Sequence, residues 1–270
     1  MLPLVVVGFD NGLGRSVPKI KRHHRTVIII AVSVTLLAVA YFVFLFRATS
    51  PLFRAERPLE GMVITYTDQP LVVDPGSSIW DSVELQTVRL VPQSARVAFG
   101  RSEKEIRVGG MFNDTKVAFM IEIDDGTEDL GGLVNPDSCA IMLVPLNDPA
   151  AAQMMGNESK ANIWQWSADR NDARYQQNDH SVNVIRELVA EGPTTQRPLE
   201  SENVQGRGWY DGATWRVVFT RQLRSLQADE HELKPGVELS IAFAAWNGSE
   251  VESFSRKSIS VLMPLQVGAR

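Results

Sequence analysis

The feature that most constrains this chain is an uncharged apolar run near its N-terminus. Residues Val27 to Phe46 read VIIIAVSVTLLAVAYFVFLF and lie between Arg25 and Arg47. At ~1.5 Å of rise per residue, a helix of this length is about 30 Å long, which matches the hydrocarbon core of a bilayer. The run is longer than the apolar segment of a signal peptide, which has roughly 7–15 residues. We therefore expect a retained transmembrane helix over 27–46.

The basic residues on either side of the run predict its orientation. More of them precede it than follow it: Arg15, Lys19, Lys21, Arg22 and Arg25 against Arg47, Arg54 and Arg57. The flank richer in lysine and arginine usually stays in the cytoplasm. Residues 1–26 are thus expected to be cytoplasmic. A linker over 47–61 would lead to a globular domain over 62–267 on the periplasmic, extracytoplasmic side of the cell membrane.

The rest of the chain reads as short strands separated by turns. In Thr115–Asp124 apolar and polar side chains alternate up to an Asp-Asp-Gly turn, and Trp209–Gly212 has the form of a hairpin turn into Thr214–Arg221. Only Ser181–Ala190 shows helical apolar spacing. Further strands are expected at 62–66, 83–91, 96–100, 105–112, 140–146, 162–167, 237–246 and 258–264. This pattern predicts an all-β, antiparallel β-sandwich with one short helix, preceded by a single N-terminal transmembrane helix.

Composition excludes several kinds of function. The net charge is −5 with both signs scattered, so no basic surface indicates binding to nucleic acid. The single cysteine, Cys139, cannot build an iron–sulfur cluster, a cysteine-type zinc site, a covalent haem attachment or an internal disulfide. Cys139 stands in an apolar run, which favours a buried, unreactive thiol. The P-loop, GxGxxG, HExxH and GxSxG motifs are absent.

Two sets of candidate metal ligands are explained more simply as surface residues. His180 and His231 stand among polar neighbours, which predicts two surface side chains. Four carboxylates follow the clearest strand, and their spacing fits a solvated acidic turn better than a calcium loop; they are Asp124, Asp125, Glu128 and Asp129.

Aromatic residues gather in three further stretches. These are Met154-Met155-Gly156 leading to Ile163-Trp164-Gln165-Trp166, Gly208-Trp209-Tyr210-Asp211-Gly212-Ala213-Thr214-Trp215, and Ala242-Phe243-Ala244-Ala245-Trp246-Asn247-Gly248. Taken alone, their tryptophans indicate core packing.

In this order and at this spacing, the stretches resemble the haem-binding γ subunits of the dimethyl-sulfoxide-reductase family of molybdenum complexes, such as ethylbenzene dehydrogenase, chlorate reductase and nitrite oxidoreductase. The resemblance covers about residues 62–267. Two features depart from it: Ile123 stands where the family tends to have tryptophan, and those γ subunits are mostly soluble. Other segments that carry it are Leu90-Val91-Pro92-Gln93, Ile123-Asp124-Asp125, Asp137-Ser138-Cys139-Ala140, Ala168-Asp169, Trp215-Arg216-Val217-Val218-Phe219 and Arg256-Lys257-Ser258.

The resemblance implies a sandwich that holds one non-covalent haem b, with a methionine and a lysine as the axial iron ligands. On the family pattern the methionine is Met155, directly before Gly156, although the adjacent Met154 competes for the role. The lysine is Lys257. Trp164 would be a further cofactor-binding residue.

The implied function is that of a non-catalytic electron-transfer subunit. It would relay single electrons between an iron–sulfur β subunit and an external carrier, with the molybdenum in an α subunit; nitrite or nitrate chemistry is our first expectation for the complex. The alternative is a membrane-tethered carbohydrate-binding or scaffolding sandwich without cofactor, in which tryptophans stack on sugars. Met155 and Lys257 separate the two hypotheses, because a sugar-binding module needs neither.

Overall fold

The computed structural model describes residues 61–93, 104–146, 160–170, 184–192, 195–199, 203–253 and 256–268. The predicted transmembrane run 27–46, the expected strand 96–100, Met154, Met155 and His180 lie outside these residues. Within them, no helix has both the length and the apolar character needed to cross a membrane.

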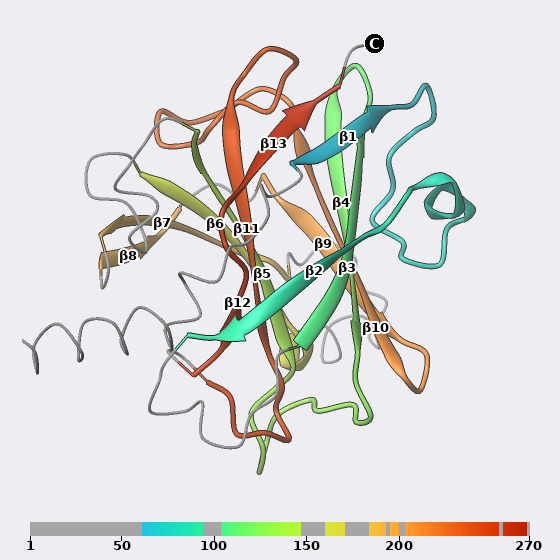
Figure 1. The fold of residues 1–270 in the computed structure, drawn as a ribbon, viewed down its shortest axis with the longest axis vertical. Helices are drawn as coiled ribbons and strands as arrows, with labels where there is room; N and C mark the ends of the chain where they lie inside the picture. Colours follow the sequence, from blue (N-terminus) through green and yellow to red (C-terminus); the bar gives the residue numbers. More distant parts are fainter. Residues whose placement is uncertain are drawn as a thin grey trace, which may run out of the picture. The chain divides into compact units, whose positions relative to one another are not determined.

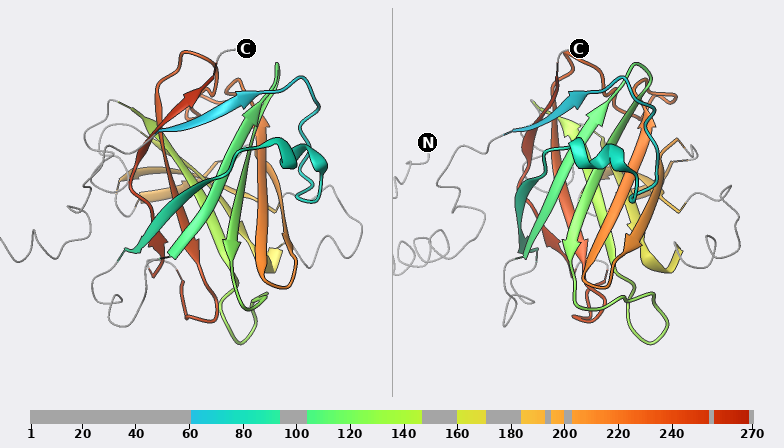
Figure 2. Two further views of the ribbon diagram at one scale, coloured as in Figure 1. Left: turned by 45° about the vertical axis from the view of Figure 1, so that its right-hand side comes forward. Right: turned by 90° about the vertical axis from the view of Figure 1, so that its right-hand side faces the viewer.

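The strands form two layers that pack face to face (Figures 1 and 2). We call them sheet A and sheet B. Sheet A runs β8 (Thr195–Pro198), β7 (Arg186–Gly192), β6 (Ala161–Ser167), β5 (Ser138–Pro145), β11 (Leu239–Trp246), β12 (Ser258–Ile259). Sheet B runs β2 (Gln86–Pro92), β3 (Lys104–Phe112), β4 (Lys116–Asp124), β10 (Thr214–Gln222), β9 (Gln205–Tyr210). Because β12 pairs with β2, the two layers are one continuous sheet folded over on itself.

Two strands depart from the expected antiparallel pattern. β1 (Met62–Tyr66) pairs in parallel with β13 (Met263–Val267) and, further along, with β3. β13 also pairs antiparallel with β11. The first and last described strands thus connect the two layers at the side shown uppermost in Figure 1.

The main core lies between the layers and follows the two-residue period of the strands. In β4, Val117, Phe119 and Ile121 are fully buried and face this core, as the alternation in the sequence predicted. Cys139 of β5 is also fully buried there, and burial raises the pKa of its thiol. The prediction that Cys139 is buried is confirmed.

The predicted helix over Ser181–Ala190 is wrong. β7 begins at Arg186, and the helical residues of the described chain lie elsewhere, in a 3-10 turn at Ser78–Ser82 and at 168–170. Residues 187–190 of β7 are all buried, so Leu188, Val189 and Ala190 follow one another without alternation between exposed and buried positions. A short run of this kind has no period that separates a buried strand from a helix.

The other strand predictions within the described residues are confirmed to within a few positions. One exception is 258–264, which divides into β12 and β13. The β9–β10 hairpin also forms as predicted, and Gly212 supplies its turn with a φ of 100° that other residues rarely adopt.

Candidate functional site

A second apolar layer covers the outer face of sheet A, away from the inter-sheet core. We call it the outer layer; its members are Ala140, Met142, Val144, Ala161, Ile163, Leu188, Ala190, Ala244, Trp246 and Leu262. In β5 the neighbours of these residues, Cys139, Ile141 and Leu143, point into the inter-sheet core. Sheet A is thus apolar on both faces. A sheet face that is open to water is usually polar, so the apolar outer face of sheet A needs an apolar covering.

Small side chains stand at two places in the outer layer. Ala140 of β5 stands directly opposite Ala244 of β11, and Ala242 stands opposite Met142. Ala161 and Ala190 are paired on β6 and β7. The paired Met142 and Ile163 lie between these two places. The layer is thus apolar across four strands, and an apolar group fits such a face.

Lys257 lies at the edge of the outer layer, one residue before β12. Because Ala245 pairs with Ser258, Trp246 and Lys257 are cross-strand neighbours, and the Lys257 Nζ atom lies 5.1 Å from the centre of the Trp246 ring. The carbonyl of Lys257 accepts a hydrogen bond from the backbone N–H of Gln93 at 2.9 Å. Burial lowers the pKa of the Lys257 amine, which favours the neutral form that can donate a lone pair.

Trp164 faces the opposite way. It is 1% exposed in the inter-sheet core, where its ring lies 5.9 Å from that of Phe119 and under the guanidinium of Arg221 at 5.1 Å. The outer layer receives Ile163 from the same strand. The structure therefore does not bring Trp164 and Lys257 together, because adjacent residues of a strand point to opposite faces.

The structure brings several of the resembling segments together at one end of the sandwich. The buried carboxylate of Asp137 accepts hydrogen bonds from Trp215 Nε1 at 3.0 Å and from the backbone N–H groups of Gly248 and Asp129, both at 2.9 Å. Asp125 accepts one from the Asn247 side chain at 2.9 Å. These segments thus form one buried polar network. Sequence reasoning missed this network, since no local pattern shows which segments meet.

The acidic turn differs from its prediction. Asp125 is only 8% exposed, and burial raises its pKa and that of Asp137. The other strand-end carboxylate, Asp124, is exposed and pairs with Arg107. In the described part of the chain, no group of three or more histidine, cysteine or acidic side chains is placed to hold a metal ion.

His231 is also more buried than predicted. Its ring Nε2 lies 2.6 Å from the carbonyl oxygen of Lys160, and its backbone N–H donates to Asn162 Oδ1 at 2.6 Å. Burial lowers the pKa of the ring. The side chain is thus engaged in a structural contact.

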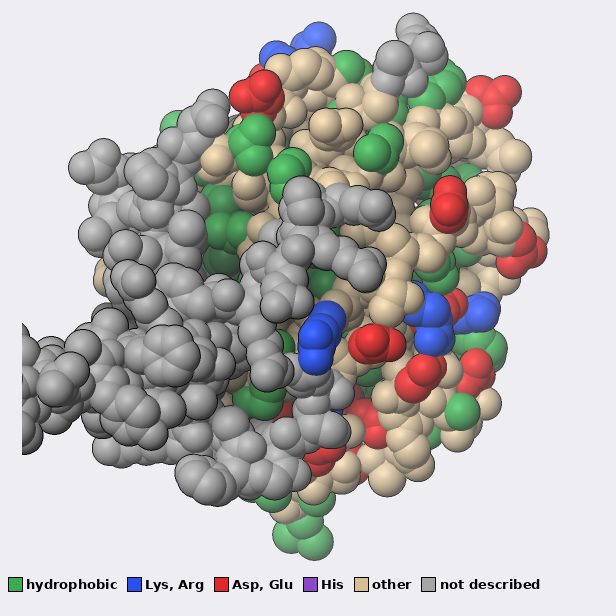
Figure 3. Space-filling view, in the orientation of Figure 1, with side chains coloured by type: hydrophobic (Ala, Val, Ile, Leu, Met, Phe, Trp, Pro, Cys, Tyr) green, Lys and Arg blue, Asp and Glu red, His purple; other side chains and the backbone are tan. Residues whose placement is uncertain are grey.

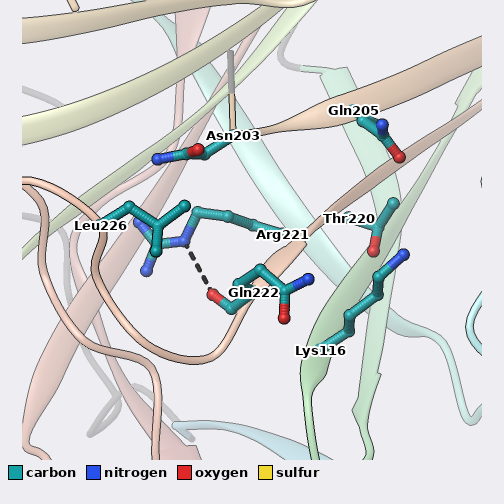
Figure 4. Close-up of a pocket in the computed structure, with 7 residues that line it drawn as sticks. All are labelled: Lys116, Asn203, Gln205, Thr220, Arg221, Gln222 and Leu226. Atoms are coloured by element: carbon teal, nitrogen blue, oxygen red, sulfur yellow. Dashed lines mark hydrogen bonds between the residues drawn. The ribbon is translucent and has the colours of Figure 1, made fainter. Parts of the chain in front are cut away.

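A cavity of about 210 Å³ lies elsewhere, against β4, β9 and β10 (Figure 4). Its lining is mostly polar and includes Lys116 and Thr220, and Figure 4 shows the Arg221 guanidinium directed away from both. Cofactor pockets are usually apolar and ~300 Å³ or more. This cavity therefore does not suit a large flat cofactor.

On the face drawn in Figure 3, acidic and basic side chains are interspersed rather than gathered by sign.

Comparison with known proteins finds relatives of this chain. The ethylbenzene dehydrogenase family matches residues 190–258, a span that ends just after Lys257. A protein of Haloferax mediterranei named as a respiratory nitrate reductase haem subunit is 28% identical over 231 residues, which cover 82% of this chain and 78% of that protein. The chlorate reductase γ subunit of Ideonella dechloratans is 28% identical over 119 residues, 43% of this chain and 44% of that protein. The chain is thus similar to haem and γ subunits of reductase complexes. Lys257 lies inside the matched span, at the edge of the outer layer.

Among solved structures, the chain is similar to a family 9 carbohydrate-binding module from Caldicellulosiruptor kristjanssonii in complex with glucose. The TM-score is 0.48 at 11% identity, covering 77% of this chain and 96% of that one. A similarity of this size carries no argument about a ligand.

Proposed function

We propose that this chain is the haem-binding electron-transfer subunit of a molybdenum oxidoreductase complex. It is a γ subunit and not the catalytic component. The observation that carries the proposal is the position of Lys257: a partly buried amine, with its pKa lowered by burial, stands at the edge of an apolar layer on the outer face of a sheet.

The residues on this face fit a non-covalent haem b. The macrocycle is flat and apolar, and the outer layer offers it an apolar face that includes several alanines. Lysine binds iron only as the neutral amine, and its ordinary pKa is ~10.4. Desolvation by the surrounding side chains already acts in the required direction. In this proposal Lys257 supplies one axial ligand.

The second ligand in this proposal is Met155, in the connection between β5 and β6. That connection leaves the outer layer after Val144 and returns to it at Ala161. Residues 155 and 161 are six positions apart, and six extended residues span roughly 20 Å. Both Met155 and Met154 are therefore close enough to Ala161 along the chain for this proposal, in which one of them reaches the outer layer. Trp164 supports the same sheet from behind and makes its contacts in the core.

A bound haem would supply a one-electron couple. The chain itself would do the remaining work. The outer layer would exclude water from the haem. Lys257 would offer the lone pair of its neutral amine to the iron. The sheet would hold the outer layer and Lys257 in place. Thioether ligation favours the ferrous form and raises the reduction potential, which suits an acceptor of electrons from a high-potential donor.

The partners follow from what this chain lacks. With one cysteine it cannot hold an iron–sulfur cluster, so a separate iron–sulfur β subunit would connect it to a molybdenum-containing α subunit. An external carrier would complete the path. We propose nitrate or nitrite as the substrate of the complex, supported by the name of the Haloferax relative. The helix over 27–46 would tether the domain to the periplasmic side of the membrane.

The sugar-binding alternative gains no support from the tryptophans. Trp80, Trp164, Trp166 and Trp215 are buried, and a stacking platform needs an exposed ring. Trp209 is 44% exposed, but no other tryptophan is exposed beside it.

The test is an absorption spectrum of the purified full chain, oxidised and then reduced. We expect sharp α and β bands on reduction. Met155→Ala or Lys257→Ala should convert a low-spin spectrum to high-spin or release the haem, whereas His180→Ala and His231→Ala should leave it unchanged. Lys116→Ala is the matched lysine control, since Lys116 lies at the start of β4 in sheet B and not in the outer layer. A spectrum that depends on a histidine and survives both ligand substitutions would refute the ligand assignment.

A further inference from the structure

A buried carboxylate closes the turn that separates Trp246 from Lys257. Glu252 is 1% exposed, and its side chain is fully covered. Its Oε2 atom accepts a hydrogen bond from the backbone N–H of Asn247 at 2.7 Å, and its Oε1 atom accepts one from Ser258 Oγ at 3.5 Å. Asn247 directly follows Trp246, and Ser258 directly follows Lys257. One carboxylate thus binds the chain beside both members of the stacked pair.

The backbone before Glu252 is strained. Val251 has a φ of 59°, a conformation that β-branched residues rarely adopt, and its side chain is 60% exposed. Packing of the valine does not explain the strain, because most of that side chain is in solvent. The conformation instead belongs to a tight turn in which the Val251 N–H donates to Gly248 and the Glu252 N–H donates to Asn247. Strain of this kind persists where the surrounding structure requires it.

Lys104 is a counter-ion of the Glu252 carboxylate. Lys104 Nζ lies 3.5 Å from Glu252 and 3.1 Å from Glu250, whose side chain is 41% exposed. A buried carboxylate costs stability unless hydrogen bonds and a counter-charge compensate for it. An amide or an apolar residue would close a turn without that cost. The retained charge therefore calls for a role beyond holding two strands together.

We propose that Glu252 is a positioning residue for Lys257, holding the lysine and the Trp246 ring against each other at the edge of the outer layer. The inference rests on the proposed function, in which Lys257 is an axial ligand of haem iron. Lysine has a long, flexible side chain, and its ligation is stable only if its backbone and its apolar stem are fixed. Glu252 holds the residue after Lys257 through the Ser258 hydroxyl, and the Trp246 ring contacts the amine end of the lysine.

The test compares Glu252→Gln with Glu250→Gln in the full chain. Both substitutions remove one carboxylate from Lys104, but only the first removes the charged acceptor of Asn247 and Ser258. The first measurement is backbone hydrogen exchange of the haem-free protein, and the second is carbon monoxide binding to the ferrous haem-loaded protein. A six-coordinate haem binds carbon monoxide only when an axial ligand leaves.

For Glu252→Gln we expect exchange over 246–259 to accelerate about tenfold, as loss of a charge-assisted hydrogen bond predicts, while β4 and β10 exchange as before. Carbon monoxide binding should accelerate by a similar factor with haem retained. Glu250→Gln should change neither rate. Ser258→Ala, which removes only the contact on the β12 side, is the milder variant if Glu252→Gln fails to fold.

Unchanged exchange, or exchange that rises equally in β4 and β10, overturns the proposed clamp. Faster local exchange with unchanged carbon monoxide binding shows that Glu252 stabilises the turn without positioning the ligand, and it also overturns the proposal. A wild-type chain that binds no haem refutes the proposed function, and the ligand role assigned to Glu252 with it; the exchange measurement still reports separately on the clamp.

Discussion

Gly208→Ala tests the packing behind sheet A. A Cβ atom at Gly208 would lie 2.3 Å from Cζ2 of Trp166 and 2.6 Å from its Cε2. Contacts at ordinary van der Waals distance begin near 3.4 Å, so one of the two must move by about 1.1 Å, the difference between 3.4 and 2.3 Å. Trp166 is fully buried and its ring lies 4.9 Å from that of Trp215. A rigid ring held on its other side by a second indole has little freedom to move.

The expected cost is therefore in the upper part of the range for overpacking, about 2–3 kcal/mol of unfolding free energy. That is a large fraction of the ~5–15 kcal/mol by which domains are stable. The assay is urea denaturation followed by circular dichroism, with Gly126→Ala as the control, because nothing lies within 4 Å of a Cβ at Gly126. The control should stay within ~0.5 kcal/mol of wild type.

A double-mutant cycle identifies the clash. In a Trp166→Phe background the benzo ring is gone, so adding Gly208→Ala should cost much less than it does alone. If Gly208→Ala unfolds at the wild-type urea concentration, or if its cost is the same in both backgrounds, the steric argument is refuted.

Four further predictions concern stability, topology and partners. Asp137→Ala leaves three buried N–H donors without an acceptor, at ~1–3 kcal/mol each, so we expect no cooperative unfolding transition at room temperature; a normal urea curve would contradict this. Arg107 holds the pKa of Asp124 below its usual range. The pair therefore contributes stability above the unfolded pKa of ~3.9, and this stability is lost as the pH falls through the lower pKa of the folded state. Because both side chains are partly in solvent, Arg107→Met should remove less than ~1 kcal/mol at neutral pH. Membrane fractionation and N-terminal sequencing should find a membrane-bound chain that keeps residues 27–46, and a soluble form beginning near residue 51 would mean a cleaved signal. Mild-detergent purification from native membranes should recover a multi-cysteine iron–sulfur subunit and a large molybdenum subunit together with this chain. A haem-loaded chain that purifies alone would refute the proposed complex.

Sequence patterns predicted the strands best where apolar residues recur at every second position. In β4, Val117, Phe119 and Ile121 share the inter-sheet core face, and the pairing with β10 runs from Thr214 opposite Asp124 to Gln222 opposite Lys116. Sheet A has two apolar faces, and in β7 apolar residues follow one another without a two-residue period. This explains the false helix at Ser181–Ala190, since a short apolar run has no period that separates a buried strand from a helix.

The candidate site was predictable only in part. Lys257 came from the family resemblance, and the sequence around it, Arg256-Lys257-Ser258, reads as an ordinary polar strand end. Its contact with Trp246 depends on the β11–β12 register, which the turn and Glu252 set together. A signal was nevertheless present: Ala140, Met142 and Val144 alternate with Cys139, Ile141 and Leu143, and such double-sided apolar character indicates a strand covered on both faces.

The parallel pairing of β1 with β13 has a consequence for how the protein is made. Met62 and Ile64 find their partners in Leu265 and Val267, which a ribosome adds some two hundred residues later. During synthesis, β1 therefore has one edge that no neighbour can satisfy, and unpaired edges invite association with other chains. Contacts of such separation also form slowly. Until β13 is made, a nascent chain of this kind is open to association through β1, and ribosomal stalling before residue 263 should leave an aggregation-prone product.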